Sequence, residues 1–171
     1  MITGDDVIIH DDCVFKRAHD IIIGSHVAID KGFYCSTKLE VRDYVHISPY
    51  VTTIGGAKCS VFLDNFTFVA AGTKLICGTE KYTEDGLIGA TIPLKYRCLT
   101  LGKIVFEKFS GCGVNCVIMP NVVLAEGSVV GANSVVTKST EPWTVYVGSP
   151  AKPVKVRPHD NILKYAKELG Y

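Results

Sequence analysis

The sequence predicts an all-β fold, a parallel β-helix in which short strands coil turn upon turn. Two observations support it: an apolar residue recurs at every sixth position over most of the chain, and a small or β-branched companion stands four positions after most of these anchors. A helix needs a spacing near 3.6 and a plain strand a spacing of about 2, so this period fits neither alone. From residue 106 onward the anchors are Phe106, Cys112, Ile118, Leu124, Val130 and Val136, and the companions are Ser110, Cys116, Val122, Ser128 and Ser134.

The same six-residue frame extends towards the N-terminus. Each hexad supplies one flat side with its anchor inward and three sides close a turn, so about 18 residues advance the chain by one strand spacing of roughly 4.8 Å. One turn cannot bury its apolar face without its neighbours, so we expect successive turns to hydrogen-bond to each other. The upstream anchors are Ile23, Ile29, Cys35, Val41 and Ile47, then Ala57, Leu63, Val69 and Leu75, with a degraded copy at Ile9 and Phe15; the companions are Val27, Phe33, Leu39, Val45 and Val51.

Interruptions of the frame bear on function. It gains two residues between Phe15 and Ile23 and about four around Ile54–Gly56, which predicts small bulges at corners of the coil. No hexad fits between about residues 76 and 103. A break of that length in a compact domain is usually functional or disordered, and apolar residues such as Tyr82 and Ile88 argue against disorder. We therefore expect an ordered excursion that caps a binding site, or alternatively a structural flap against a neighbouring subunit.

The chain is expected to divide into a β-helix, residues 1–155, and a helical tail, residues 156–171. The repeat ends at 141–143, a strand-like 144–147 follows, and 148–152 either carries function or is a simple turn. A helix is predicted from His159 to Leu169, with Asp160 or Asn161 as its cap and Gly170 as its stop. Its apolar face is expected to seal the end of the coil or to pack on a partner, and comprises Ile162, Leu163, Ala166 and Leu169.

Composition excludes several classes of protein. Lys plus Arg (18) nearly balances Asp plus Glu (17), so no global field favours nucleic acid or anionic membrane. No apolar run approaches the roughly 18 residues of a membrane span, and the N-terminus lacks the basic and apolar blocks of a signal peptide. The seven cysteines are an odd number without a zinc-type Cys-x-x-Cys pair. They predict reduced, mostly buried side chains in a cytoplasmic protein.

Two sets of motifs resemble a known family. The run 130–138 with Trp143 and 147–152 is similar to the closing stretch of hexapeptide-repeat acetyltransferases. The run 91–97, with 45–48 and 54–56, is similar to a narrower branch of that family. This branch holds sugar O- and N-acetyltransferases of surface-polysaccharide pathways, including lipopolysaccharide and capsule. The resemblance spans nearly the whole chain and implies a left-handed coil, a homotrimer, and acetyl-CoA lying between two coils.

The resemblance also implies which residues hold the coenzyme. Flat faces of a β-helix have no deep pocket, so a cleft must come from coils packed side by side with the excursion on top. Backbone groups near Gly111, Gly113 and Ala132 are candidates for the amides of pantetheine. Two lysines within the matching motifs are candidates for its phosphates, or else are solvated surface residues. The motif residues in question are Lys138, Ser149 and Lys152.

Acetyl transfer needs a base for the acceptor and donors for an oxyanion. Histidine is the usual base because its unperturbed pKa lies near 6.5. His46 directly precedes the inward anchor Ile47, so strand alternation turns it outward onto a flat face. It is our candidate, with a surface or interface role as the alternative. The other histidines lie in the tail, a bulge, the degraded first copy and a mid-hexad position, and are His159, His19, His10 and His26.

The acceptor is left open. Many members of the family with simple sugar or amino-acid acceptors carry a histidine in the excursion, and this excursion has none, so acidic residues there would act as base or bind an acceptor amine. We expect a sugar or nucleotide-linked sugar, acetylated on oxygen or nitrogen. The candidate acceptor residues are Glu80, Tyr82, Asp85, Lys95 and Arg97, with Glu84 as a further acid.

Two other classes compete with the transferase. A zinc lyase of the carbonic anhydrase type needs three convergent histidines, but His26 and His46 are 20 residues apart rather than 18 and should not stack. No metal is therefore expected. A non-catalytic scaffold is the other alternative, and it would show no stabilisation by coenzyme A.

Overall fold

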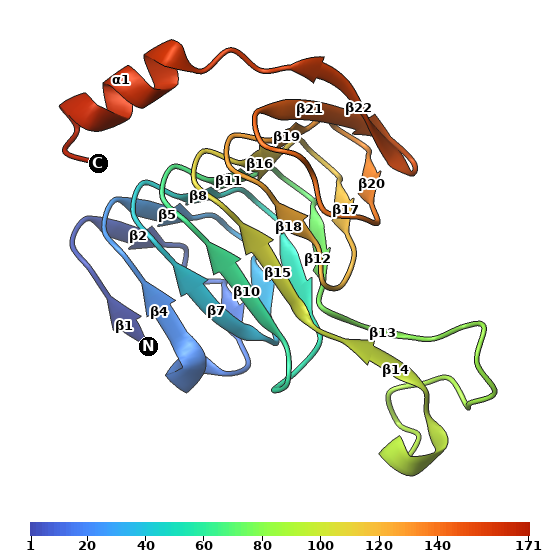
Figure 1. The fold of residues 1–171 in the computed structure, drawn as a ribbon. Helices are drawn as coiled ribbons and strands as arrows, with labels where there is room; N and C mark the ends of the chain where they lie inside the picture. The colour runs from blue at the N-terminus through green and yellow to red at the C-terminus, as the bar shows by residue number, and fades with distance from the viewer.

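The computed structural model describes residues 1–171 and shows a three-sided coil of parallel strands, with one long excursion and a C-terminal helix (Figure 1). Sheet A contains β1 (Ile2–Thr3), β4 (Ile21–Ile23), β7 (Lys38–Val41), β10 (Ser60–Leu63), β15 (Lys103–Phe106) and β18 (Val123–Leu124). Sheet B contains β2 (Val7–Ile9), β5 (Val27–Ile29), β8 (His46–Ile47), β11 (Phe68–Val69), β16 (Gly111–Cys112), β19 (Val129–Val130), β21 (Thr144–Gly148) and β22 (Ala151–Val156). Sheet C contains β3 (Val14–Phe15), β6 (Tyr34–Cys35), β9 (Thr52–Ile54), β12 (Lys74–Ile76), β17 (Val117–Ile118) and β20 (Val135–Val136).

Each turn passes through sheets A, B and C in that order, and β21 begins a seventh turn. The predicted parallel β-helix is thus confirmed. We name the three edges of the coil the A–B, B–C and C–A corners. No helix is long and apolar enough to cross a membrane.

The hexad frame defines the core. All anchors and companions predicted between residues 23 and 51 and between 106 and 136 are buried. The apolar ones belong to one cluster of 27 residues, and the three serines are buried beside it. The seven cysteines are unpaired and five of them are buried. One anchor was wrong: Ala57 is exposed, and Thr53 takes the inward place, in register with Cys35 and Leu75. The extra residues lie at 54–58, where the frame placed them. Thr53 is accommodated inside the coil, where its hydroxyl lies 3.0 Å from that of Thr37.

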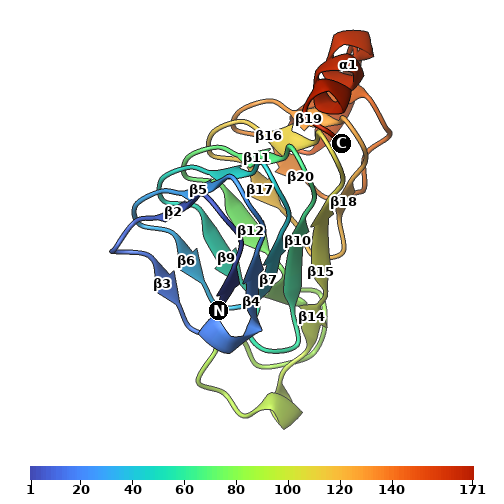
Figure 2. The ribbon, with the colours of Figure 1, turned by 90° about the vertical axis from the view of Figure 1, so that its left-hand side faces the viewer.

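All three interruptions lie at the C–A corner. The first is the 3₁₀ turn η1 (Ala18–Asp20), the second is the bulge 54–58, and the third is the excursion. The excursion is an antiparallel hairpin of β13 (Gly78–Glu80) and β14 (Leu99–Leu101), whose tip contains the 3₁₀ turn η2 (Leu94–Tyr96). Figure 2 shows it projecting beyond the coil on the side where η1 lies. The coil resumes in register behind it, with Leu63 beside Phe106.

The C-terminal tail does not seal the end of the coil. The run 148–152 is the turn of a hairpin in which β22, a strand the sequence did not predict, pairs antiparallel with β21. The helix α1 (Asp160–Glu168) then runs back along the A–B corner (Figure 1). His159, and neither of the predicted residues, occupies the N-cap position, because its ring stacks on Trp143 with centroids 4.3 Å apart and so fixes where the helix starts. Gly170 ends the helix at φ +88°.

A ladder of aromatic rings runs along the A–B corner beneath this tail. Consecutive ring centroids lie 4.5, 5.1, 5.3 and 5.8 Å apart. Each ring belongs to a corner residue with positive φ, a conformation that is uncommon for large side chains. Stacking of this kind contributes about 0.5–1.5 kcal/mol per pair beyond burial, which offsets part of the backbone cost. The ladder consists of His26, Tyr44, Phe66, Phe109 and Trp143.

Candidate active site

A hollow of about 620 Å³ lies at the C–A corner, between the base of the excursion and the bulge 54–58. We call it the excursion hollow. Its walls include Ile54, Leu99 and Leu101, and its polar groups include Glu80 and Arg97. The bulge and the excursion therefore border one space. They contain two of the motifs that resemble the sugar branch, 54–56 and 91–97, which lie more than 20 residues apart in the sequence. The hollow lies beside the excursion, where the sequence predicted a capped binding site.

Three of the five predicted acceptor residues line this hollow: Glu80, Tyr82 and Arg97. The other two do not. Asp85 is exposed elsewhere on the excursion, and Lys95 is exposed with its Nζ 4.7 Å from the centre of the Tyr96 ring.

Glu80 and Arg97 form the electrostatic centre of the hollow. Arg97 donates to Glu80 Oε1 from Nε at 3.0 Å and from Nη2 at 2.6 Å, and the backbone N–H of Gly89 donates to the same oxygen at 3.2 Å. The Arg97 guanidinium lowers the pKa of Glu80, and the Gly89 N–H acts in the same direction. The second oxygen, Oε2, is buried without a hydrogen-bond partner. Glu80 thus presents an ionised carboxylate with one unsatisfied oxygen.

Lys58 is a residue of the hollow that sequence reasoning missed. It follows the two bulge glycines, lines the hollow, and makes no ion pair, whereas Arg97 is committed to Glu80. The positive φ of Gly56, +77°, turns the chain so that Lys58 lies on the rim. A lysine two residues after a Gly-Gly interruption of the hexad frame was the available signal.

The predicted base, His46, lies on the outer face of sheet B as expected. Its side chain is 52% exposed, and its Nε2 lies 2.8 Å from Asp30 Oδ2. It borders a shallow hollow of about 430 Å³, the His46 hollow, whose walls include Tyr44, Phe66 and Phe68. Because one ring nitrogen is engaged by Asp30, Nδ1 is the nitrogen left for a substrate.

Asp30 was not predicted, although the frame could have revealed it. Ile29 pairs in register with Ile47, so the residue after Ile29 lies one turn below and diagonally beside His46. Asp30 and His46 are 16 residues apart, which is close to one turn of the coil.

One chain does not bring His46 and the excursion together. His46 projects from sheet B, whereas the excursion leaves the coil at the C–A corner, which is opposite that sheet (Figure 1). A site that uses both needs two chains.

The residues assigned to the coenzyme separate into groups. Gly113 and Ala132 stack at the B–C corner, where a Cβ on Gly113 would lie 2.8 Å from the Ala132 nitrogen. The turn containing Ser149 continues this corner, since the Gly148 N–H donates to Ser134 Oγ at 2.9 Å. Lys152 is exposed on β22 nearby.

Two coenzyme candidates lie elsewhere. Gly111 is buried beneath the ring of Phe68, which fills the space where its Cβ would be, so its backbone does not face solvent as expected. The lack of a side chain at Gly111 instead allows the Phe68 ring to lie flat on sheet B. Lys138 follows β20 and is exposed at the C–A corner, away from Ala132.

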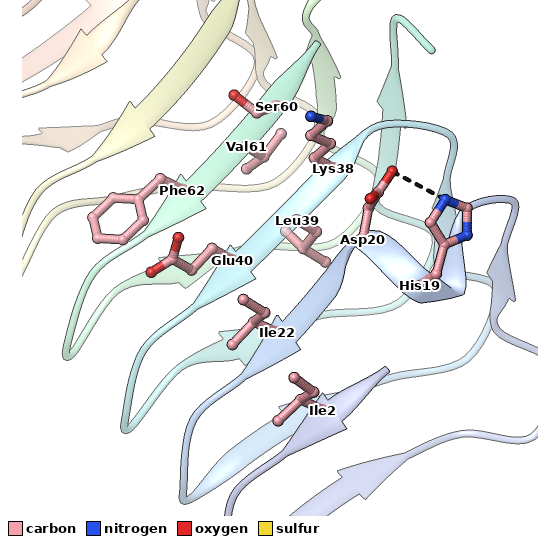
Figure 3. A pocket seen from close by; sticks show the side chains of 10 residues that line it. All are labelled: Ile2, His19, Asp20, Ile22, Lys38, Leu39, Glu40, Ser60, Val61 and Phe62. Atoms are coloured by element: carbon pink, nitrogen blue, oxygen red, sulfur yellow. Dashed lines mark ion pairs between the residues drawn. The ribbon is translucent and has the colours of Figure 1, made fainter. Parts of the chain in front are cut away.

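A further hollow of about 370 Å³ lies on the outer face of sheet A beside η1 (Figure 3). Its titratable pair is His19 and Asp20, 3.4 Å apart. Arg17 Nη2 lies 2.6 Å from Asp20 Oδ2, and hydrogen bonding from Arg17 lowers the pKa of Asp20. The pair is therefore part of the ion-pair structure of the bulge. The rest of this hollow is the outer face of sheet A, with exposed Ile2 and Ile22 and the charged side chains of Lys38 and Glu40 (Figure 3).

Potential metal ligands gather at one place. His10, Asp11 and Asp12 bring their ligand atoms within 4.8 Å of one another, all on exposed side chains. His26 lies at the A–B corner stacked on Tyr44, and so does not stack with His46, as the spacing predicted.

Comparison with known proteins places this chain in a class defined by its coil: it belongs to the hexapeptide-repeat acyltransferases. No family model matches it. The dTDP-4-amino-4,6-dideoxy-D-glucose acyltransferase of Escherichia coli is 31% identical over 157 residues, covering 90% of this chain and 81% of that enzyme. A putative lipopolysaccharide biosynthesis O-acetyl transferase of Escherichia coli K12 is 31% identical over 133 residues, covering 76% of this chain and 63% of that protein.

Solved structures agree with this placement. AntD, an N-acyltransferase from Bacillus cereus solved in complex with dTDP and coenzyme A, superimposes with a TM-score of 0.93 at 30% identity. The match covers 98% of this chain and 90% of AntD, so the excursion is part of it. Another structure of AntD, in complex with dTDP and 3-hydroxybutyryl-CoA, superimposes with a TM-score of 0.91.

Proposed function

We propose that this chain transfers an acyl group from acyl-CoA to the amine of a nucleotide-linked aminosugar. The observation that carries this proposal is the likeness, over 98% of the chain, to an N-acyltransferase that binds dTDP and coenzyme A. The E. coli relative named for a dTDP-linked aminosugar supports the same acceptor class. The cytoplasm is the proposed location, in keeping with unpaired cysteines.

The excursion hollow is the proposed acceptor site. An amine arrives in water largely as an ammonium, and the ionised Glu80 in the wall of the hollow provides the opposite charge for it. Lys58, the cation on the rim without an acidic partner, suits a phosphate of the nucleotide. The apolar walls favour a sugar with few hydroxyl groups, because an unpaired hydroxyl buried there would be costly.

The chemistry is assigned to His46 of a neighbouring protomer. The bound amine first gives one proton to solvent and so becomes a neutral nucleophile. Its nitrogen then attacks the thioester carbonyl while His46 Nδ1 takes the second proton, the C–S bond breaks, and the imidazolium returns that proton to the departing thiolate. Asp30 holds the ring in place through Nε2 at 2.8 Å. The coenzyme is placed between two coils along the B–C corner, at Gly113, Ala132 and Ser149.

We propose the homotrimer that the family resemblance implies, and the position of these residues supports a site shared between protomers. His46 and the excursion lie on opposite sides of one chain, so each site would combine the sheet B face of one protomer with the excursion of the next. Lys152 and Lys138 would then meet coenzyme phosphates from different protomers.

The acceptor is tested with a panel. The purified chain is given acetyl-CoA with dTDP-4-amino-4,6-dideoxyglucose, with other nucleotide aminosugars, and with matched nucleotide sugars that lack the amine, while thiol release and product mass are followed. Turnover of the amines alone supports the proposal. Turnover of the hydroxyl sugars alone would replace it by O-acetylation, which the lipopolysaccharide relative favours. No turnover, together with no thermal shift by coenzyme A, would indicate a scaffold.

The shared site is tested by complementation. His46→Ala and Glu80→Ala chains, each inactive alone, are dissociated, mixed and reassembled. A site built from two protomers regains activity in the mixture, because some interfaces combine an intact His46 with an intact Glu80. A mixture as inactive as its parents would place both residues in one protomer's site and contradict the assignment.

A further inference from the structure

The tail, residues 157–171, lies along the A–B corner as a strap that is fixed firmly at its start. Arg157 donates from Nη1 to the carbonyl oxygens of Phe109 at 2.7 Å and of Gly127 at 2.9 Å. Its guanidinium also lies 5.9 Å from the centre of the Trp143 ring, on which His159 stacks. This end is joined to the coil by several independent contacts.

The far end is held by one residue. Tyr171 donates its hydroxyl to Asp43 Oδ2 at 2.8 Å, in the third turn of the coil, whereas the strap begins beside Trp143 in the seventh. Its ring lies edge-on to Tyr44 and Phe66, with centroids 5.5 and 5.2 Å away. We call this set of contacts the latch.

Between these two ends the strap is loosely held. From residue 160 to residue 171 only Ala166 is buried, and no hydrogen bond joins residues 160–170 to the coil. An apolar hollow of about 230 Å³ remains beneath the helix, between Phe68 and Leu169 among others. Segments with few buried contacts open at a small fraction of the global unfolding free energy, so the latch decides how often this end of the strap opens.

The latch adjoins the proposed catalytic face. The hollow beneath the helix and the His46 hollow share Phe66 and Phe68 as walls. Tyr44, which the Tyr171 ring contacts, also lines the His46 hollow. The end of the strap is therefore continuous with one wall of the space beside His46.

We propose that the strap opens and closes at the latch, and that it closes over a substrate bound at the His46 face. This inference rests on the proposed function to the extent that a substrate occupies that face. Opening of the strap does not depend on acyl transfer, and it can be measured separately from turnover.

The experiment measures opening by limited proteolysis. Trypsin cleaves at Lys164 and Lys167, which are exposed on α1 but are protected while the helix is folded on the coil. Tyr171→Phe removes only the hydroxyl of the latch. Tyr165→Phe is the matched control, because Tyr165 is exposed on the same helix and makes no side-chain hydrogen bond. Rates are compared without ligand, with saturating coenzyme A, and with a dTDP-linked aminosugar.

Loss of one such hydrogen bond should raise cleavage about five- to tenfold in Tyr171→Phe and leave Tyr165→Phe at the wild-type rate. In the wild type, the ligand that binds the His46 face should slow cleavage by trypsin. In the acyl-transfer assay, the KM for that same ligand should rise in Tyr171→Phe while kcat is unchanged. Equal cleavage of both variants, or protection by neither ligand, would overturn the proposal. If no acyl transfer is found at all, the proposed function falls while the comparison of the two variants still reports on the latch.

Discussion

Replacement of His46 by alanine separates catalysis from stability. The side chain is 52% exposed, so its loss should change the free energy of unfolding by no more than about 0.5 kcal/mol. For a chain of this length that corresponds to a Tm shift within about 2 °C. Loss of a general base should instead lower kcat/KM by about 10²–10⁴, or about 2.7–5.5 kcal/mol of transition-state stabilisation. Asp30→Asn, which leaves His46 in place but weakens its orientation, should cost about 10- to 100-fold.

His10→Ala is the matched control for this prediction. His10 is 47% exposed and also has an aspartate partner, Asp12 at 2.7 Å, but it lies in the first turn of the coil and does not line the His46 hollow. Both variants are assayed by thiol release from acetyl-CoA with the best acceptor of the panel, beside thermal unfolding. We expect His10→Ala to stay within about twofold of the wild type in activity. Equal activity of His46→Ala and His10→Ala would refute His46 as the base and leave the fold untouched.

Three further predictions follow from the excursion hollow and the core. The pKa of Glu80 is lowered in the folded chain, so the stability that its bond to Arg97 gives the excursion is complete above the unfolded-state pKa of about 4.3 and is lost as pH falls through the folded-state pKa. Pepsin should therefore cut within residues 81–98 faster below the folded-state pKa. Cleavage of Glu80→Gln with the same pH dependence as the wild type would contradict this. Lys58→Ala should raise the KM for a nucleotide-linked acceptor about tenfold and leave the KM for acyl-CoA unchanged. Lys95→Ala, which removes a lysine outside the hollow, is the control. An equal effect of both variants would mean that the net charge of the chain, and not Lys58 itself, sets the KM. Phe106 is 0% exposed, so Phe106→Ala should lower the free energy of unfolding by about 3–5 kcal/mol. Urea unfolding measures this as a lower midpoint. A loss below about 1 kcal/mol would mean that the coil repacks around the smaller side chain.

The hexad period predicted the coil because each anchor position obeys one local rule, burial of an apolar side chain. That rule reached its limit at Thr53, a polar residue that is 0% exposed. Its hydroxyl finds a partner in Thr37 only once two turns are stacked, and no pattern along the chain contains that contact. The sequence therefore favoured Ala57, which is apolar and also in frame.

The candidate site was predictable in its parts but not in its assembly. The outward direction of His46 follows from strand alternation and is confirmed. The pairing of Arg97 with Glu80 spans 17 residues and depends on how the hairpin closes, which no hexad describes. Lys58 and Asp30 belong to no family motif, and only their neighbours in the folded chain indicate a role for them. The tail was misplaced for the same reason, since the ladder on which it lies draws one ring from each of five turns.

The hairpin that ends the coil bears on how copies of the chain associate. A stack of parallel strands exposes unpaired backbone groups at its last turn, and such edges template growth into fibres. Here β22 runs antiparallel across sheet B and carries Pro153, which has no N–H to offer. On sheet A the last amides, of Val123 and Ala125, are taken by the side chains of Ser139 and Thr140. At the opposite end the first turn bears exposed aspartates at 5, 6, 11 and 12, and burial of these charges in an end-to-end contact would be costly. Polymerisation end to end is thus opposed at both ends, and lateral contact is the mode of association that the coil leaves open.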